Sequence, residues 1–292
     1  MHSTKIPARK KLNLLRSLQG CWLLLLFALF IHEAGCGRTS QSTLQETLRH
    51  IVGTTEIPRF VLRGEAETAP WKQTQVFYRQ RDFHPAWIRD HWLGGHTTHS
   101  QTGTLLKCLR DASQEGLDPS EYRADDLEQQ IRRIQRLTTP NELAWLDARL
   151  TYSFFEFAAH LHRGRLNPKR ISLNWQVASR KREFAPFLEE ALAQMNVCGV
   201  LAKLPPALSQ YVALRKALGV YHRIAEEGGW PVVPNIKTLK IGDTGNAVKL
   251  LRNSLEKQGD FASDGSDTSP LFDEHLAAAV RAFEARNGLP VD

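Results

Sequence analysis

The sequence predicts an all-α protein that consists of a helical domain followed by a small terminal module. Apolar residues recur at spacings of three and four residues through most of the chain, as expected for amphipathic helices. The strict alternation of apolar and polar residues that marks a half-buried strand is almost absent before residue 236. Clusters of Gly, Pro and Asp separate the helical patterns, so about six or seven helices are expected in the larger domain.

Residues 1–36 have the features of a targeting segment. A basic stretch is followed by the apolar run Cys21–Ile31, which is shorter than the ~20 residues that a membrane-spanning helix needs. This pattern predicts a secretory signal peptide, with an uncleaved anchor as the alternative. The triplet Ala34-Gly35-Cys36 is similar to the end of a bacterial lipoprotein signal, although Glu33 stands where that signal has a branched apolar residue. Cys36 is therefore a candidate for lipidation and for attachment to a membrane, and the mature chain is expected in the periplasm or cell envelope.

The charge of the chain does not indicate a nucleic-acid-binding protein. The formal net charge is +7, and residues 1–36 contribute +4 of it. The remaining positive charge is small and is not clustered in the way that nucleic-acid binding requires. No nucleic acid is therefore expected as a partner.

The helical domain is expected to span residues 73–235. It is preceded by a polar entry segment, residues 37–72, which we expect to be loosely ordered apart from a short helical pattern near Leu44–Ile51. The dense aromatic residues between Phe77 and Trp87 predict a packed substructure. Helices are then predicted at Gln101–Gly116, Ala124–Arg136, Asn141–Leu161, Pro186–Met195 and Ser209–Glu226. The third of these is the longest and is apolar over a wide arc, so it should be the central buried helix.

The terminal module, residues 236–292, is expected to contain a Gly-Asp turn and two helices. In the first helix, Val248, Leu251 and Leu255 share one face. The second begins after Asp273, a suitable N-cap, and ends at Gly288, a suitable left-handed C-cap. Two short helices bury their apolar faces poorly on their own.

This order of turn and helices resembles the small three-helix peptidoglycan-binding domain of bacterial cell-wall enzymes. The resemblance is carried by Leu239, Gly242, Asp243, Gly245, Val248, Leu251, Leu255, Gly259, Phe272, Asp273, Ala279, Val280, Phe283, Gly288 and Leu289. Members of that family usually continue with a third helix, so the module is expected to be truncated.

Further motifs extend the resemblance over about residues 74–292, to the non-catalytic front of large periplasmic L,D-transpeptidases. These motifs are YRQRDFHPAW, GLDPSEY, HLHRGRLNP and GGWPVVP. The resemblance implies a cell-envelope scaffold that binds peptidoglycan, without naming the residues that bind it. Two alternatives stay open: the front fragment of an intact L,D-transpeptidase, or a structural envelope lipoprotein without affinity for glycan.

The catalytic domain of that acyltransferase family uses a Cys nucleophile within a Ser/His-Gly-Cys-x-Arg sequence. Neither Cys108 nor Cys198 stands in such a sequence, so no catalytic residue, and no cofactor, is assigned to this chain. In an oxidising compartment these two cysteines could form a disulfide, or they could remain buried thiols; both alternatives stay open.

Other polar residues indicate chemistry only weakly. His160 and His162 lie two positions apart, which places them on different sides of a helix and argues against a shared metal ion. No metal site is therefore assigned. Glu156 lies among aromatic residues that could raise its pKa, as in a glycosidase acid, although a surface-facing Glu is the commoner explanation. The acidic pairs Asp125-Asp126 and Glu189-Glu190 are typical of solvated helix faces.

Overall fold

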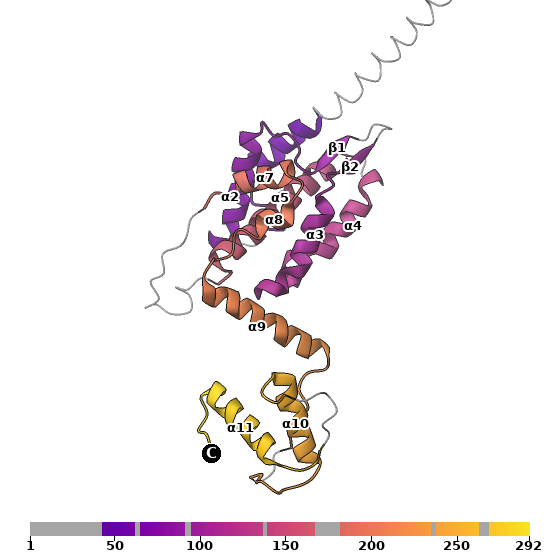
Figure 1. Ribbon diagram of the computed structural model, residues 1–292. Coiled ribbons are helices and arrows are strands. Elements are labelled where there is room, and N and C mark those ends of the chain that lie inside the picture. The colour runs from indigo at the N-terminus through magenta and orange to yellow at the C-terminus, as the bar shows by residue number, and fades with distance from the viewer. Residues whose placement is uncertain are drawn as a thin grey trace, which may run out of the picture. The chain divides into compact units, whose positions relative to one another are not determined.

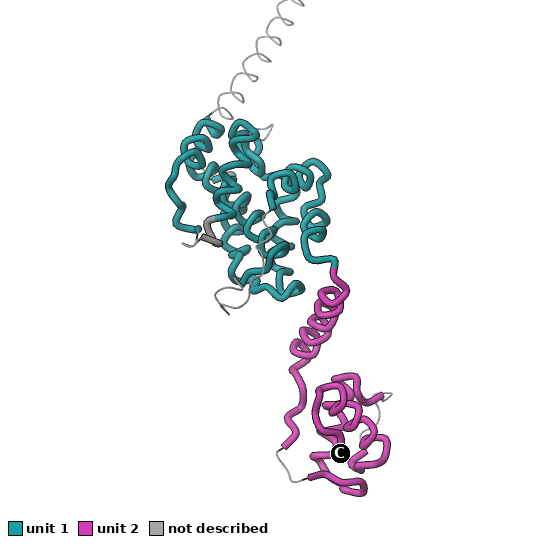
Figure 2. The backbone as a smooth tube through the Cα atoms, turned by 90° about the vertical axis from the view of Figure 1, so that its left-hand side faces the viewer, with its two compact units in different colours: residues 1–207 teal, residues 208–292 magenta. Residues whose placement is uncertain are grey.

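The computed structural model describes residues 43–61, 65–90, 95–136, 139–166, 182–234, 238–262 and 269–292. The chain divides into two compact units, residues 1–207 and residues 208–292 (Figure 2). Both are mainly helical in their described parts (Figure 1), and the all-α prediction is confirmed. Residues 1–36, for which the sequence predicts a targeting segment with a candidate lipidation site at Cys36, lie outside the described residues.

The first unit is a set of helices with one small hairpin. Its elements are a helix over 43–53, α2 (Glu65–Gln80), β1 (Ile88–Asp90), β2 (His96–Thr98), α3 (Thr102–Arg110), η1 (Asp111–Glu115), η2 (Pro119–Tyr122), α4 (Ala124–Arg132), η3 (Ile134–Arg136), α5 (Pro140–Arg163), α7 (Ala185–Ala193) and α8 (Val197–Leu201). Helix α5 contacts α2, α3 and α4. It is therefore the central helix that its wide apolar arc predicts.

Helix α5 begins at a well-formed cap. The Thr139 hydroxyl accepts a hydrogen bond from the Glu142 amide, and the Glu142 carboxylate accepts one from the Thr139 amide, at 3.3 and 3.4 Å. Pro140 occupies the first helical position, where it lacks only an N–H that would have no partner inside the helix. The helix continues to Arg163 and stops at Gly164.

Three parts of the first unit differ from the expectation. Helix α2 begins within the expected polar entry segment and runs through Pro70, because burial of Trp71, Phe77 and Tyr78 outweighs the loss of one helical hydrogen bond. The helix over 43–53 agrees with the helical pattern predicted near Leu44–Ile51, but it is packed into the domain rather than loosely attached, because Leu44 and Leu48 belong to the core.

The third difference is the hairpin. Strands β1 and β2 pair antiparallel in the register Ile88↔Thr98, Arg89↔Thr97 and Asp90↔His96. Each strand has three residues, which is too short for an alternation to be recognised in a sequence.

The two cysteines of the described residues form a disulfide. It joins Cys108 on α3 to Cys198 on α8 across a sequence separation of 90 residues, with the Cα atoms 6.0 Å apart. The disulfide is therefore the alternative that the structure supports.

The second unit contains α9 (Ser209–Glu226), α10 (Asn246–Gln258) and α11 (Glu274–Asn287). The buried residues Val248, Leu255, Phe261, Phe272 and Leu276 form its core. The predicted caps are confirmed: the Asp273 carboxylate accepts from the Leu276 amide at 2.8 Å, and Gly288 ends α11 with a φ of 68°. Leu251, Val280 and Phe283 are only partly buried against this core.

None of the helices in the described ranges combines the length and the apolar character that crossing a membrane requires.

The disulfide should contribute measurably to stability. Replacing both Cys108 and Cys198 by Ala should lower the free energy of unfolding of the first unit by about 2–4 kcal/mol, because the link restricts the unfolded chain over a long loop. Chemical denaturation followed by circular dichroism measures this difference. A reducing agent should destabilise the wild type and leave the double variant unchanged; a wild type indifferent to reduction would contradict the expectation.

Candidate functional site

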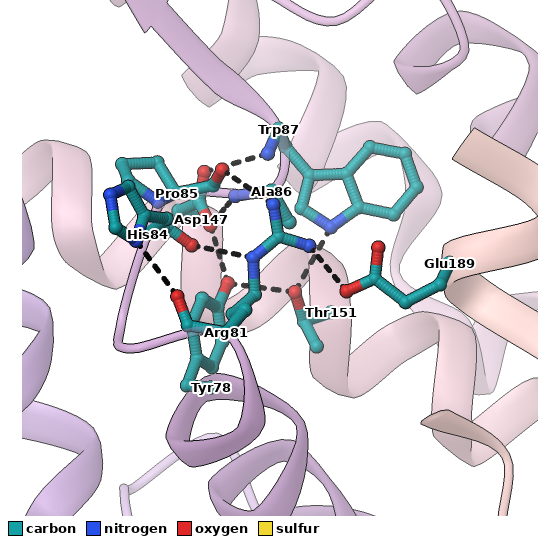
Figure 3. Close-up of polar contacts among 9 residues, drawn as sticks. All are labelled: Tyr78, Arg81, His84, Pro85, Ala86, Trp87, Asp147, Thr151 and Glu189. Carbon is teal, nitrogen blue, oxygen red and sulfur yellow. Dashed lines mark hydrogen bonds and ion pairs between the residues drawn. The ribbon is translucent and has the colours of Figure 1, made fainter. Parts of the chain in front are cut away.

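Asp147, in the middle of α5, is a fully buried acidic residue of the first unit. Its carboxylate accepts hydrogen bonds from the Tyr78 hydroxyl and from the backbone amides of Ala86 and Trp87 (Figure 3). It also accepts one from the backbone amide of Ile88. The three amide bonds measure 2.9, 2.8 and 2.7 Å. Burial raises the pKa of Asp147, and the bonds from Tyr78 and the amides oppose that shift because they favour the charged form.

Thr151 extends this network by one helical turn. Its hydroxyl accepts from the Trp87 indole at 3.0 Å and lies 2.8 Å from the Tyr78 hydroxyl. Since the Tyr78 proton is donated to Asp147, Thr151 donates to Tyr78. Burial, followed by the charge of Asp147, raises the pKa of Tyr78 well above its ordinary value. The polar groups of Tyr78, Asp147 and Thr151 thus all have hydrogen-bond partners inside the protein.

A second, more exposed layer fixes the turn between α2 and β1. The Arg81 guanidinium donates to the carbonyls of His84 and Pro85 at 2.8 and 3.1 Å and to the Glu189 carboxylate at 2.9 Å (Figure 3). Within this turn Asp82 and Phe83 have φ values of 50° and 58°. Left-handed conformations cost non-glycine residues ~1–3 kcal/mol each. The Arg81 and Asp147 hydrogen bonds offset that cost, so the RDFHPAW motif has a structural explanation.

The arrangement around Asp147 cannot act on a substrate. Asp147, Thr151, Tyr78 and Trp87 are all buried, and each polar group already has its partner inside the protein. A catalytic acid or base must instead reach the proton that it transfers.

A second titratable cluster lies where α5 passes η2. Glu156 is half-buried and accepts a hydrogen bond from the Tyr152 hydroxyl at 2.8 Å. Burial raises its pKa to about 7; the hydrogen bond from Tyr152 opposes this, the charge of Glu121 adds to it, and Arg123 and Arg165 oppose it. From the sequence, aromatic neighbours could raise the pKa of Glu156, and in the structure burial does raise it.

His160 and His162 have separate neighbours. The Nδ1 atom of His160 lies 2.9 Å from the Tyr122 hydroxyl, whereas the His162 ring packs edge-on against Phe184. In the described part of the chain, His, Cys, Asp and Glu side chains do not gather in groups of three that could hold a metal ion.

The acidic pairs lie at the surface in ion pairs. Asp125 pairs with Arg110 at 2.8 Å, and Glu189 and Glu190 pair with Arg81 and Lys203 at 2.9 and 2.7 Å. Asp125 and Asp126 also line an open pocket of about 410 Å³ with Arg110, Pro119, Ser120, Arg123 and Ala124.

In the second unit, the buried side chain of Arg252 connects α10 to the start of α11. Its guanidinium donates to the Leu271 carbonyl and to the Asp273 carboxylate, at 2.8 and 2.9 Å, and lies 4.8 Å from the centre of the Phe261 ring. Asp273 is also the N-cap of α11. One ion pair therefore holds the two helices of the module in register.

Sequence reasoning did not single out Asp147 or Arg252, and it named Tyr78 only as part of the aromatic stretch that predicts a packed substructure. For Asp147 a signal was present: the acid stands inside LAWLDARL, within a helix whose apolar arc is too wide to leave that position in solvent.

Replacing Asp147 by Asn should destabilise the first unit by about 3–5 kcal/mol, because the new amide group would direct its own N–H at backbone donors. Asp126→Asn is the matched control, since Asp126 is exposed and its change should stay within about 0.5 kcal/mol. Urea unfolding of both variants tests this. Equal losses in the two would show that the Asp147 network contributes nothing of its own.

Glu156 should make stability depend on pH. The pKa of Glu156 is about 7 in the folded protein, against the ordinary 4.5. Between these two pH values the folded protein keeps the proton on Glu156, whereas the unfolded chain has lost it. The free energy of unfolding therefore falls as pH rises from 4.5 to 7, by up to about 3 kcal/mol. Glu156→Gln should lack this decline, while Glu46→Gln, an exposed control, should keep it. Thermal unfolding at both pH values measures the effect; parallel curves for wild type and Glu156→Gln would contradict it.

Comparison with protein families gives two matches. Residues 72–218 match the Scaffold domain, and residues 244–292 match a peptidoglycan binding domain. No match was found among curated proteins or among solved structures. The first family covers α2 to α9, with the Asp147 network inside it, and the second covers α10 and α11. The chain therefore belongs to the Scaffold domain family, the N-terminal scaffold of L,D-transpeptidases, and carries a peptidoglycan-binding domain after that scaffold.

Proposed function

We propose that this protein is exported to the cell envelope and acts there as a scaffold held on peptidoglycan by its terminal module. The match of residues 244–292 to a peptidoglycan binding domain carries the proposal. The targeting pattern of residues 1–36 supports export, and the Ala34-Gly35-Cys36 triplet supports a lipid anchor at Cys36. The mass of the mature N-terminus tests both: an intact Met1 would exclude export with cleavage, and an unmodified Cys36 would exclude the anchor.

We further propose that this chain does not itself transfer acyl groups. Cysteine chemistry requires a thiolate. Both cysteines of the described residues are joined in a disulfide, and neither stands in the Ser/His-Gly-Cys-x-Arg context of the transpeptidases that the chain resembles. The Scaffold domain favours one alternative, in which the chain is the front part of a longer L,D-transpeptidase.

A single incubation with purified peptidoglycan sacculi tests both parts of the proposal. The full chain should sediment with the sacculi, and muramidase digestion afterwards should release no additional cross-linked dimers. Arg252→Ala should strongly weaken sedimentation, because loss of the buried guanidinium and of its hydrogen bonds to Leu271 and Asp273 destabilises the module by roughly 1.5–3 kcal/mol. Arg281→Ala, an exposed change on α11, is the matched control and should bind like the wild type.

Failure of the wild type to sediment would overturn the binding role. New dimers in the digest would overturn the proposal that the chain is not an enzyme.

A further inference from the structure

The second unit carries two aromatic side chains, Tyr221 and Trp230, that are not part of its buried core. Tyr221 on α9 is 51% exposed and Trp230 is 38% exposed, although the two rings pack edge-to-face with their centres 5.6 Å apart. In the first unit, by contrast, Trp71 and Trp87 are 2% and 0% exposed. Among the described tryptophans, Trp230 is the most exposed.

The backbone after α9 is built to present Trp230. Gly228 and Gly229 have φ values of 93° and 77°, and their amides donate to the carbonyls of Ala225 and Ile224 at 3.1 and 2.8 Å. Two successive left-handed residues reverse the chain at the helix end, which a residue with a side chain adopts only under strain. This reversal brings Trp230 back against Tyr221.

Side chains from α10 and α11 lie beside both aromatic residues. The Lys257 ammonium donates to the Gly229 carbonyl at 3.0 Å, next to Trp230 in the chain. Arg286 on α11 forms an ion pair with Asp260 at 2.5 Å and lies over the Phe283 ring at 5.8 Å. Asp260 first, and the Tyr221 side chain after it, raise the pKa of the Arg286 guanidinium by hydrogen bonding. Three segments of one compact unit therefore hold the pair in place.

We propose that Tyr221 and Trp230 form a carbohydrate-binding surface that stacks against pyranose rings of the peptidoglycan glycan strand. This inference rests on the proposed function and names the part of peptidoglycan that is recognised. Rigid aromatic rings with a polar edge offer a large contact area at low entropic cost, and their faces suit the apolar C–H faces of a sugar ring.

The charges around the pair also favour the glycan over the stem peptide. The charge of the Arg286 guanidinium is balanced by Asp260, and N–H groups of Arg286 and Lys257 can donate to sugar hydroxyl and acetamido oxygens. A guanidinium that already holds a carboxylate has less to offer the carboxylates of a stem peptide.

The test uses the full chain and two probes: purified sacculi, and a soluble N-acetylglucosamine tetramer that has no stem peptide. Trp230→Ala and Tyr221→Ala should each weaken binding of the tetramer roughly two- to tenfold, which corresponds to ~0.5–1.5 kcal/mol for one aromatic contact. Trp230→Phe should restore much of the affinity. Leu214→Ala, a change at a 71% exposed position of the same helix, is the matched control and should leave binding unchanged.

Isothermal titration with the tetramer and sedimentation with sacculi give the readouts, and unchanged circular dichroism and melting temperature show that the variants are folded. If the wild type binds sacculi but ignores the tetramer, or if both aromatic variants bind as the wild type does, the glycan proposal is overturned while the proposed function stands. If the wild type fails to bind sacculi, the proposed function and the glycan proposal fall together.

Discussion

Apolar packing can bring α2, α5 and the turn before β1 together, but it cannot fix their register, because hydrophobic contacts have no direction. The hydrogen bonds that the Asp147 carboxylate accepts do have a fixed direction. The carboxylate lies on the central helix and accepts three successive amides of residues 86–88 together with the Tyr78 hydroxyl. Displacing the turn by one residue would leave buried donors without acceptors. The helical domain thus depends on a group that apolar packing alone would exclude, and together with Arg81 that group offsets the strain of the turn at Asp82 and Phe83.

In the small module a buried cation, Arg252, has the role that the Asp147 carboxylate has in the helical domain. Arg252 is fully buried, and its partner Asp273 also caps α11, so one ion pair fixes both the approach of the two helices and the start of one of them. The pair is buried on the Arg252 side and partly exposed on the Asp273 side, so it adds little net stability and acts mainly by favouring one arrangement of the two helices. Each compact unit therefore combines an apolar core with a buried charged side chain whose hydrogen bonds fix the positions of its neighbours.

The sequence was a good guide to helices and a poor one to polar contacts. Long periodic patterns such as those of α5 and α9 were placed to within a few residues, and the caps Asp273 and Gly288 were recognised because capping is local chemistry. The hairpin, the continuous α2 and the burial of the helix over 43–53 were missed, because each depends on partners distant in sequence. For the same reason a sequence cannot show that Asp147 meets residues 86–88, or that Cys108 meets Cys198.

The covalent link between α3 and α8 bears on how long a folded molecule persists. Its two sulfur atoms lie in α3 and α8, which contact one another in the folded unit although α4, α5 and α7 stand between them in the chain. Reduction removes the covalent bond and leaves these contacts in place. Oxidised and reduced molecules should therefore share one shape and differ in lifetime, since the lifetime of the native state depends on the interactions that must break before the unit opens.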